Sequence, residues 1–270
     1  MKATWTSEVI GVEKPIIAMC HLNALPGDPH FDVKGGMKSV IEWARKDFLA
    51  LQNGGVDAVM FSNEFSQPYM VKVEPITVAA MAFVIAELMP DIRIPFGVDV
   101  IVDPMRTLDL AAVTGAKFIR SVFSGVYASD LGLWDTNGSV TARYRQARGL
   151  EDVRMLYTVV LENMAVYLQP RDIVDIALTT VTNFEPDALC VSGKAAGSEA
   201  DVSTMKRIKD ALPDSIVFAN NGVNAGNVLE QLKVADGGVV GTTFKYEGKF
   251  VNHVDQSRVK ELMDKVKSIR

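Results

Sequence analysis

Cysteine and long hydrophobic runs are scarce in this sequence of 270 residues. Two cysteines are too few for a disulfide scaffold at this length. The most apolar helix-like stretch, residues 76–89, is shorter than the roughly 20 residues that an untilted membrane-spanning helix needs. The amino-terminal residues MKATWTSEVIGVEKP lack the apolar core of a signal peptide. We therefore expect no transmembrane segment, a cytoplasmic location and two reduced thiols.

The sequence also lacks an excess of positive charge. Its 28 Lys and Arg residues against 33 Asp and Glu residues give a net charge of −5. Binding along a nucleic acid needs a basic face, so we expect no nucleic-acid partner. Hydrophobic residues make up 48% and charged residues 23%, which is typical of ordered globular proteins. The 20 Gly and 11 Pro residues exclude a collagen-like chain.

What the sequence does contain is a repeated alternation of β-rich runs and helix-like stretches. The runs are continuously apolar, as in Ile16-Ile17-Ala18-Met19-Cys20, which is typical of parallel strands buried on both faces. The helix-like stretch 37–52 places Val40, Ala44 and Phe48 on one stripe. The spacing between runs averages about 32 residues, the size of a βαβ unit. Eight runs begin near Pro15, Val56, Ile94, Ala116, Val153, Pro186, Ile216 and Gly237.

Eight such units predict an α/β fold, a single (β/α)8 barrel over residues 1–270 with residues 1–13 as an amino-terminal lead-in. A doubly wound open sheet is the second interpretation, and it is disfavoured because no GxGxxG turn follows the first run. The third and fourth units are the least regular. We expect residues 127–138, within the fourth, to form a long loop that serves as a lid or a subunit contact.

Two glycine-containing segments after the seventh and eighth runs carry the most specific functional signal. These are Asn221-Gly222-Val223 and Gly241-Thr242-Thr243. In barrels these loops often bind phosphate, because glycine lets the backbone approach the anion and free amide groups face it. Ordinary glycine turns that close the barrel are the alternative. The placement favours a site for a small phosphorylated ligand.

Polar residues at the carboxyl ends of the other strands complete the predicted site. His21 is a candidate general base or metal ligand, or a histidine that only hydrogen-bonds at the rim. Glu64, Asp99 and Glu162 are candidate catalytic carboxylates. Asp99 and Asp103 are the candidate ligands for Mg²⁺ or Mn²⁺. The alternative for each carboxylate is a helix cap or an ion pair.

Three more residues at strand ends are expected to bind the anionic substrate. Arg120 and Lys194 carry the positive charge for this role, and Ser192 adds a hydroxyl group. A Schiff base at Lys194 is disfavoured against an ordinary solvated lysine, because glycine and alanine surround it in its loop. No Cys and His spacing typical of a zinc site is present.

Several segments of the sequence, in the same order, resemble the BtpA/SgcQ family. They are KPIIAMCHLNALPGDP, NGGVDAVMFSNEF, GAKFIR, DALCVSG, ADGGVVGTTFK and the later VDQSRV. The resemblance runs from about residue 8 to residue 268 and is closer to the SgcQ branch than to the photosystem-biogenesis branch. It implies a barrel of the ribulose-phosphate-binding type. The activity it implies is that of a nucleosidase, with a non-catalytic biogenesis factor as the alternative. A sugar-phosphate isomerase or lyase fits the predicted site equally well.

Three strand ends depart from the photosystem branch. That branch typically has an acidic-Asn-Phe-Gly-Asp pattern after the second strand, Arg-Asn-Asp after the third and Lys-His after the fifth. This chain has Ser62-Asn63-Glu64-Phe65-Ser66, Ile101-Val102-Asp103-Pro104 and Glu162-Asn163 at those places. The changes imply a different ligand or role from that branch. A homo-oligomer is the expected assembly, since most soluble oligomers are symmetric homomers.

Overall fold

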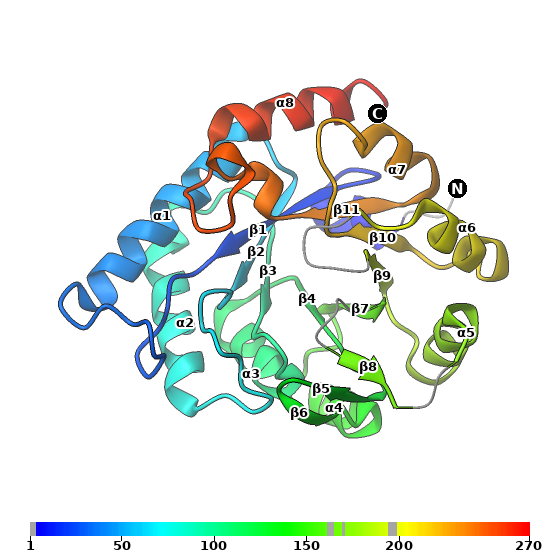
Figure 1. Cartoon of the computed structure of the whole chain (residues 1–270), viewed down its shortest axis with the longest axis horizontal. Coiled ribbons are helices and arrows are strands. Elements are labelled where there is room, and N and C mark those ends of the chain that lie inside the picture. The colour runs from blue at the N-terminus through cyan, green and yellow to red at the C-terminus, as the bar shows by residue number, and fades with distance from the viewer. Residues whose placement is uncertain (1–3, 161–164, 169–170, 194–198) are drawn as a thin grey trace.

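Eight parallel strands close into a barrel with helices around it (Figure 1). The computed structural model describes residues 4–160, 165–168, 171–193 and 199–270. Each of the eight predicted runs forms one barrel strand, so the predicted (β/α)8 barrel is confirmed. In spatial order the strands are β1 (Ile16–His21), β11 (Gly237–Val240), β10 (Val217–Asn220), β9 (Ala188–Ser192), β7 (Arg154–Val160), β4 (Phe118–Ser121), β3 (Phe96–Asp99) and β2 (Ala58–Ser62).

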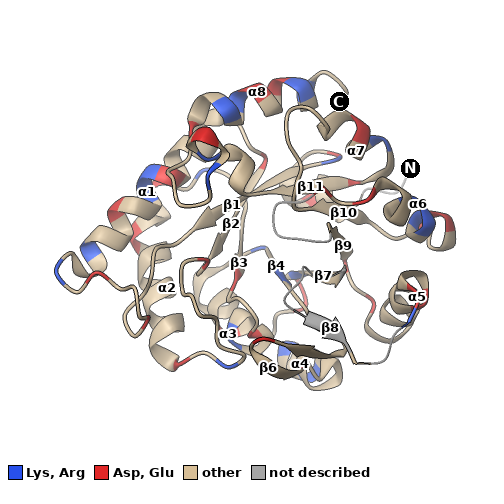
Figure 2. Ribbon diagram, in the orientation of Figure 1, with Lys and Arg blue, Asp and Glu red and all other residues tan. Residues whose placement is uncertain are grey.

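The outer layer consists of α-helices whose apolar faces pack on the strands. α1 buries Val40, Ala44, Phe48 and Leu51, the stripe that its sequence predicts. Lys, Arg, Asp and Glu lie mostly on these helices and on the loops (Figure 2). The helices are α1 (Gly36–Gly54), α2 (Pro75–Leu88), α3 (Pro104–Thr114), α4 (Gly138–Ala147), α5 (Ile173–Phe184), α6 (Val202–Ala211), α7 (Val228–Val234) and α8 (Gln256–Lys267).

The interior of the barrel is filled by side chains from alternate strand positions. Phe118 and Phe218 are fully buried there, and two glycines make room for their rings. A Cβ atom at Gly97 would lie 2.3 Å from the Phe118 ring, and one at Gly237 would lie 2.5 Å from the Phe218 ring. The glycines in the third and eighth runs therefore answer a packing demand in the core.

Aspartates just before three strands join neighbouring strands at the amino-terminal end of the barrel. The carboxylate of Asp57 accepts the backbone N–H of Ile16 (2.8 Å). Asp187 and Asp236 accept those of Met155 and Val217 in the same way, each at 2.8 Å. These aspartates also pair with basic side chains from Arg270, Arg154 and Lys209. The acidic residue in these strand-start segments is therefore structural.

The amino-terminal segment closes the same end of the barrel. Trp5 precedes a π-helical turn, Thr6–Ile10, and stacks on Phe218 with a ring-centroid distance of 6.1 Å. Its indole Nε1 donates to the backbone oxygen of Asp187 (2.8 Å). Trp5 and Ile10 thereby extend the apolar core below the strands.

A small antiparallel sheet stands where a long loop was expected. β5 (Val126–Ser129) and β6 (Gly132–Asp135) form a hairpin, and β8 (Ala165–Tyr167) pairs with β5. Tyr127 and Trp134 alternate with exposed residues along the hairpin and pack with Val102 and Val122 into a second small core. The prediction of a long loop over residues 127–138 is therefore wrong where these residues form the hairpin. Among the described residues, every helix is too short or too polar to span a bilayer.

Candidate active site

A cavity of about 400 Å³ opens at the carboxyl ends of the barrel strands. One wall comes from the loops after β10 and β11, and the rest of the lining comes from β1, β4, the loop after β2 and the start of α8. Its volume lies in the range of small-molecule sites. The lining residues are Met19, His21, Glu64, Arg120, Asn221, Gly222, Asn224, Gly241, Thr242, Thr243, Gly248, Phe250 and Arg258.

The loop after β10 is held in an unusual backbone conformation. Asn221 and Gly222 both have positive φ angles, 72° and 65°. The side-chain amides of Asn224 and Asn227 donate to the Gly222 carbonyl oxygen at 3.2 and 3.0 Å, which fixes the turn. Within the described part of the chain, the buried Nδ2 group of Asn221 has no hydrogen-bond partner. A ligand in the cavity can accept this hydrogen bond.

The loop after β11 is tied to the loop after β10. The Thr243 hydroxyl donates to the backbone oxygen of Val223 (2.7 Å), and the Val223 side chain is buried in the core. Gly241 and Thr242 face the cavity. The two predicted phosphate-binding segments therefore meet at one wall of the cavity. The Thr243 hydroxyl is used to hold the two loops together, and the buried Val223 side chain is not available to a ligand.

Arg258 is a cavity residue that the sequence analysis did not identify. It lies in the first turns of α8, and its Nε donates to the backbone oxygen of Thr243 (2.8 Å). The guanidinium group thus reaches the wall formed by Gly222 and Thr242. The signal was present in the segment VDQSRV, which opens the helix of the eighth unit and contains this arginine.

A buried ion pair anchors the segment between β11 and α8. Lys245 and Asp47 are fully buried, and Lys245 Nζ lies 2.7 Å from Asp47 Oδ2. The other carboxylate oxygen of Asp47 accepts the backbone N–H of Val254 at 3.0 Å and lies 2.7 Å from His253 Nδ1. Asp47 belongs to α1, so this helix holds the segment that carries Thr242, Thr243 and Phe250 to the cavity.

His21 is a buried histidine inside the mouth of the barrel. It is 3% exposed, and its ring contacts Phe65 and Phe250 at centroid distances of 6.3 and 5.3 Å. Burial, helped by the positive charges of Lys245 and Arg120, holds the pKa of His21 well below its usual range. The imidazole is therefore neutral at pH 7. Its Nδ1 atom has no partner among the described residues.

Gly241 packs directly against the His21 ring. A Cβ atom at this position would lie 3.2 Å from the ring atoms Cε1 and Nε2. Any larger residue would therefore press on the imidazole or shift it. The predicted role of Gly241 as part of a phosphate loop thus coincides with a packing role beside the histidine.

A chain of hydrogen bonds crosses the upper layer of the barrel. Arg120 donates to Asp99 Oδ2 (3.0 Å) and to Asn220 Oδ1 (2.7 Å), and Asn220 donates to the Ser192 hydroxyl (2.8 Å). Burial raises the pKa of Asp99, and the Arg120 guanidinium opposes that rise. Asp99 and Asn220 thus orient Arg120, which lines the cavity, while Ser192 holds the far end of the chain.

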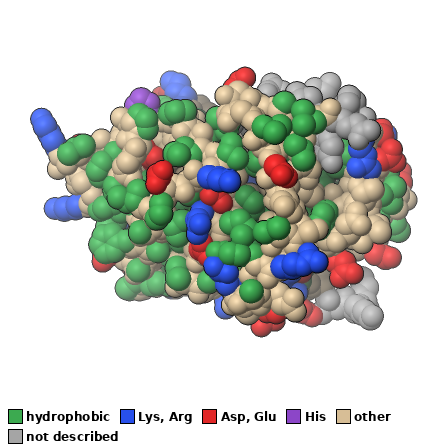
Figure 3. All heavy atoms as spheres, turned by 90° about the horizontal axis from the view of Figure 1, so that it is seen from below, with side chains coloured by type: hydrophobic (Ala, Val, Ile, Leu, Met, Phe, Trp, Pro, Cys, Tyr) green, Lys and Arg blue, Asp and Glu red, His purple; other side chains and the backbone are tan. Residues whose placement is uncertain are grey.

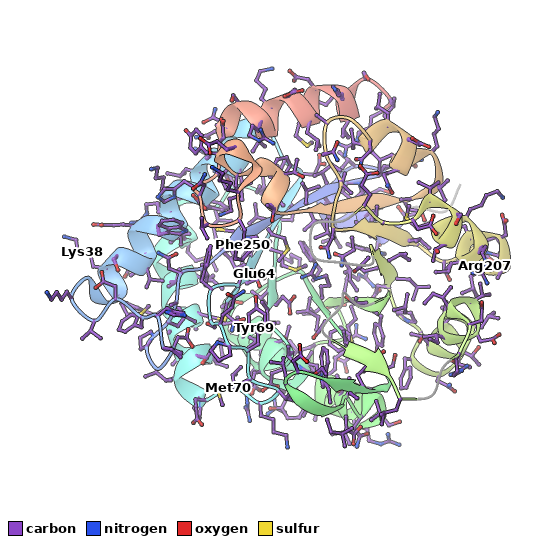
Figure 4. All side chains as sticks on the ribbon, viewed as in Figure 1. Lys38, Glu64, Tyr69, Met70, Arg207 and Phe250 are labelled. Atoms are coloured by element: carbon purple, nitrogen blue, oxygen red, sulfur yellow. The ribbon has the colours of Figure 1, made fainter. Side chains whose placement is uncertain are left out.

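Glu64 supplies a carboxylate to the cavity from the loop after β2. It accepts a hydrogen bond from the Ser62 hydroxyl at Oε2 (3.0 Å), and Tyr69 donates to its backbone oxygen (2.9 Å). Figure 4 shows Glu64 between Phe250 and Tyr69 at the mouth of the barrel. The predicted residues His21, Glu64 and Arg120 therefore line one cavity together with the predicted loop residues.

The carboxylates predicted as metal ligands are engaged with other groups. Asp103 caps α3 by accepting the backbone N–H of Arg106 (3.1 Å), and it also accepts that of Val73 (3.0 Å). Asp99 faces Arg120. No group of three or more His, Cys, Asp or Glu side chains suited to a metal ion occurs among the residues that the structure describes. The arrangement of Asp99 and Asp103 therefore does not fit a Mg²⁺ or Mn²⁺ centre. Glu162 and Lys194 lie outside the described residues.

The model of the BtpA family matches residues 12–268 of this chain. This chain belongs to the BtpA family. The sgc region protein SgcQ of Escherichia coli (strain K12) is 58% identical over 99% of both chains. The photosystem I biogenesis protein BtpA of Synechocystis sp. (strain PCC 6803) is 29% identical, over 93% of this chain and 87% of that protein.

Solved structures with little sequence similarity share the barrel. A structure described as native KDPGal has a TM-score of 0.59 at 15% identity, covering 94% of this chain and 95% of its own. Phosphoribosyl anthranilate isomerase from Thermotoga maritima also has a TM-score of 0.59 at 15% identity, covering 94% and 99%. At this identity the likeness concerns the fold.

Proposed function

We propose that this BtpA family member is an enzyme that acts on a small phosphorylated sugar. The observation that carries the proposal is the cavity of about 400 Å³ in which anion-binding groups face His21 and Glu64. The proposal rests on this geometry rather than on the barrel neighbours, since one fold hosts many activities.

The phosphate group binds at the wall formed by the loops after β10 and β11. Backbone N–H groups near Gly222 and Gly241 face an anion closely because neither residue has a side chain. The unpartnered Nδ2 group of Asn221 donates to a phosphate oxygen, and Arg258 adds a charge-assisted hydrogen bond. The ligand is thereby oriented with its sugar toward His21.

The sugar end meets groups suited to proton transfer. Glu64 removes a proton from the carbon next to the sugar carbonyl and returns it to the neighbouring carbon. The neutral His21 hydrogen-bonds the carbonyl oxygen and transfers to it the proton of the hydroxyl group on the adjacent carbon, which becomes the new carbonyl. Arg120 stabilises the negative charge that develops on these oxygens. Asp99 and Asn220 act as positioning residues for Arg120 through their hydrogen bonds. The reaction class is an isomerisation in which no net proton is gained or lost.

A thermal-shift screen with sugar phosphates, sugars, nucleosides and free phosphate, each with and without Mg²⁺, tests the binding step. A ligand at about 100 times its dissociation constant stabilises the folded state by about 2.7 kcal/mol. Gly222→Val is expected to abolish this shift. Gly149→Val is a matched control, since Gly149 also has a positive φ (63°, against 65° for Gly222) but no atom near its Cβ position. No shift with any ligand contradicts the proposal.

Proton transfer is tested by NMR in D₂O with the ligand that the screen identifies. Deuterium incorporated next to the carbonyl marks the isomerisation. Release of a free base instead marks glycoside cleavage, as in a nucleosidase, and cleavage of a carbon–carbon bond marks a lyase. Either of these two outcomes would support the proposed binding site and would assign a different reaction to it.

A non-catalytic biogenesis role is the second candidate function, and the name of the Synechocystis relative is what favours it. Under this role, Gly222→Val leaves partner binding unchanged and the cavity binds no sugar phosphate. The expected homo-oligomer stays a prediction.

A further inference from the structure

A second cavity, of about 270 Å³, lies beside the active-site cavity at the same end of the barrel. Its walls come from the loop after β1, the first turns of α1 and the loop after β2, and it is here called the β1–β2 pocket. Small-molecule sites typically have volumes of roughly 300–1,000 Å³. The β1–β2 pocket is therefore suited to a small ligand with a single ring.

One aromatic side chain, Phe65, separates the two cavities. It is half-buried and lines the β1–β2 pocket, and its ring centroid lies 4.8 Å from that of Phe250, which lines the active-site cavity. The rings of Trp43 and His21 also contact Phe65, at centroid distances of 6.2 and 6.3 Å. Because these three rings hold Phe65 in place, it offers the pocket a fixed apolar wall.

Hydrogen bonds between the loops after β1 and β2 build the β1–β2 pocket before any ligand is bound. Asp28 Oδ2 accepts the backbone N–H of Leu25 and the hydroxyl group of Ser66, each at 2.6 Å. The backbone N–H of Phe65 donates to the carbonyl oxygen of Leu22 (3.3 Å). The two loops are therefore tied together at two places. A pocket with preformed walls lowers the entropy cost of binding a ligand.

Polar side chains line much of the rest of the β1–β2 pocket. They are Asn23, His30, Asp32, Ser39 and Gln67. None of the hydrogen bonds between described residues uses the side chain of Asn23 or of His30. The Ser39 hydroxyl donates to the backbone oxygen of Gly36 (2.9 Å), so its lone pairs stay open to a donor on a ligand. The pocket thus offers a ligand both donors and acceptors of hydrogen bonds.

Negative charge in and around the β1–β2 pocket disfavours a phosphate group. Among the lining residues that the structure describes, none is Lys or Arg, and Asp32 is acidic. Asp32 lies just before α1, so its carboxylate offsets the positive end of the helix dipole that could otherwise attract an anion. Asp28 and Glu64, on the two loops that form the walls, add further negative charge nearby.

The basic residues close to the β1–β2 pocket face solvent instead. Lys34 and Lys38 are exposed, and Lys38 pairs with Glu42 (3.8 Å). Figure 4 shows Lys38 pointing away from the barrel. In Figure 3, Lys and Arg side chains at the left end of the molecule, where α1 begins in Figure 1, extend into solvent. The charges therefore favour an uncharged ligand in this pocket.

We propose that the β1–β2 pocket binds an uncharged sugar ring, at a site separate from the active-site cavity. The C–H face of the sugar packs on Phe65, and its hydroxyl groups, which both donate and accept, bond to Asn23 and Ser39. A nucleobase would also stack on Phe65, but it offers polar atoms only at its edge. The mixture of amide, hydroxyl, imidazole and carboxylate groups in the lining matches a sugar better. This binding does not depend on the reaction in the neighbouring cavity.

Saturation-transfer difference NMR of the full chain with uncharged sugars tests this site. The probes are the methyl glycosides of glucose, galactose and mannose, and adenine represents a nucleobase. Magnetisation is expected to pass from the protein to the ring protons of at least one glycoside, with a dissociation constant at or below about 10 mM. Ser39→Phe places a ring in the pocket and is expected to abolish this signal. Ser203→Phe is the matched control, since Ser203 is an exposed serine in the first turn of α6 outside the pocket, and it is expected to keep the signal.

A second variant, Asn23→Ala, removes the concern that Ser39→Phe is merely misfolded. The Asn23 side chain bonds to no described residue, so its loss is expected to leave the melting temperature unchanged. Loss of its hydrogen bond to the sugar is expected to weaken glycoside binding by about 3–10-fold. Circular dichroism and thermal melts of each variant report folding.

The active-site cavity is distinguished from the β1–β2 pocket by Gly222→Val and by inorganic phosphate. The variant is expected to keep the glycoside signal, and excess phosphate is expected not to displace the glycoside. No signal from any glycoside, a signal that survives in folded Ser39→Phe, or a signal lost in Gly222→Val overturns the proposal. Binding of adenine alone also overturns it and assigns the pocket to a flat base. A failure of sugar phosphates to bind the neighbouring cavity would change none of these outcomes.

Discussion

The two ends of the barrel are built in opposite ways. At the amino-terminal end, Trp5 and Phe218 fill the space, and aspartates clamp the starts of neighbouring strands. At the carboxyl-terminal end, Asp99, Arg120 and Asn220 replace apolar side chains, and a cavity of about 400 Å³ remains. The amino-terminal end therefore contributes stability, while the carboxyl-terminal end buries polar side chains and leaves a cavity open.

The polar end is stable only because its buried groups satisfy one another. An unpaired buried charge or amide costs far more than a paired one contributes. Arg120 therefore faces a carboxylate and an amide, and Lys245 faces Asp47. Among the described residues, five buried side-chain atoms have no hydrogen-bond partner. Two of them, His21 Nδ1 and Asn221 Nδ2, belong to residues that line the cavity, and the other three lie on Trp43, Arg154 and Gln231. This is the arrangement expected if a ligand completes the network.

The largest expected effect comes from breaking the buried ion pair that supports the polar end. Asp47→Asn leaves Lys245 charged and unpaired, and it is expected to lower the free energy of unfolding by about 3–5 kcal/mol. Urea denaturation measures this loss. The double variant Asp47→Asn with Lys245→Met is expected to recover much of it, because neither charge is then buried. Equal losses in the single and double variants would contradict this account.

Removing the Trp5 side chain, which fills the apolar end of the barrel, is expected to have the next largest effect. Trp5→Ala deletes a buried ring and a hydrogen bond, and it should lower the free energy of unfolding by about 3 kcal/mol. Ligand binding at the other end should be unchanged in the folded protein. Leu133→Ala, at a 66% exposed position of β6, is the control and should change stability by less than about 0.5 kcal/mol. A large loss of affinity in Trp5→Ala would show that the two ends are coupled.

A substitution at Arg258 tests the opposite case, a residue that lines the cavity and lies outside the core. Arg258→Gln is expected to weaken sugar-phosphate binding by about 10–100-fold and to change the free energy of unfolding by less than about 1 kcal/mol. Isothermal titration calorimetry gives the affinity. Arg143→Gln, an exposed arginine of α4 bonded to its own helix, should keep wild-type affinity. An unchanged affinity in Arg258→Gln would remove this residue from the phosphate site.

The smallest expected effect is a pH dependence that comes from His21. Because its folded pKa is lowered, the unfolded state binds the proton more readily as the pH falls through about 6.5. The stability that neutral His21 provides is present above that pH and is lost below it. Between pH 7.5 and 5.5 the wild type should lose about 1 kcal/mol more than His21→Gln. Parallel pH profiles for the two proteins would show that burial does not perturb this histidine.

The barrel and most of the residues that line the cavity could be predicted from the sequence. Continuous apolar runs at a spacing of about 32 residues are a local property, and polar residues after each run lie at one edge of a parallel sheet whatever the details. His21, Glu64, Arg120, Gly222 and Thr242 were found in this way and line one cavity. For Asp103 the sequence left a metal ligand and a helix cap open, because a carboxylate that precedes a helix serves equally well as either, and the structure shows the cap.

Only the tertiary structure decided which distant residues meet at the carboxyl-terminal end. Asp47 and Lys245 are 198 positions apart, and Arg120 and Asn220 are 100 apart, so no spacing rule connects them. Barrel closure and helix packing bring them together. The same holds for Arg258 reaching the cavity wall formed by Gly222 and Thr242. The sequence by itself determined the strands and the residues at their ends, because these depend on local patterns. Which residues pair with one another, and which side chains stay exposed, depends on contacts between segments that are far apart in the chain.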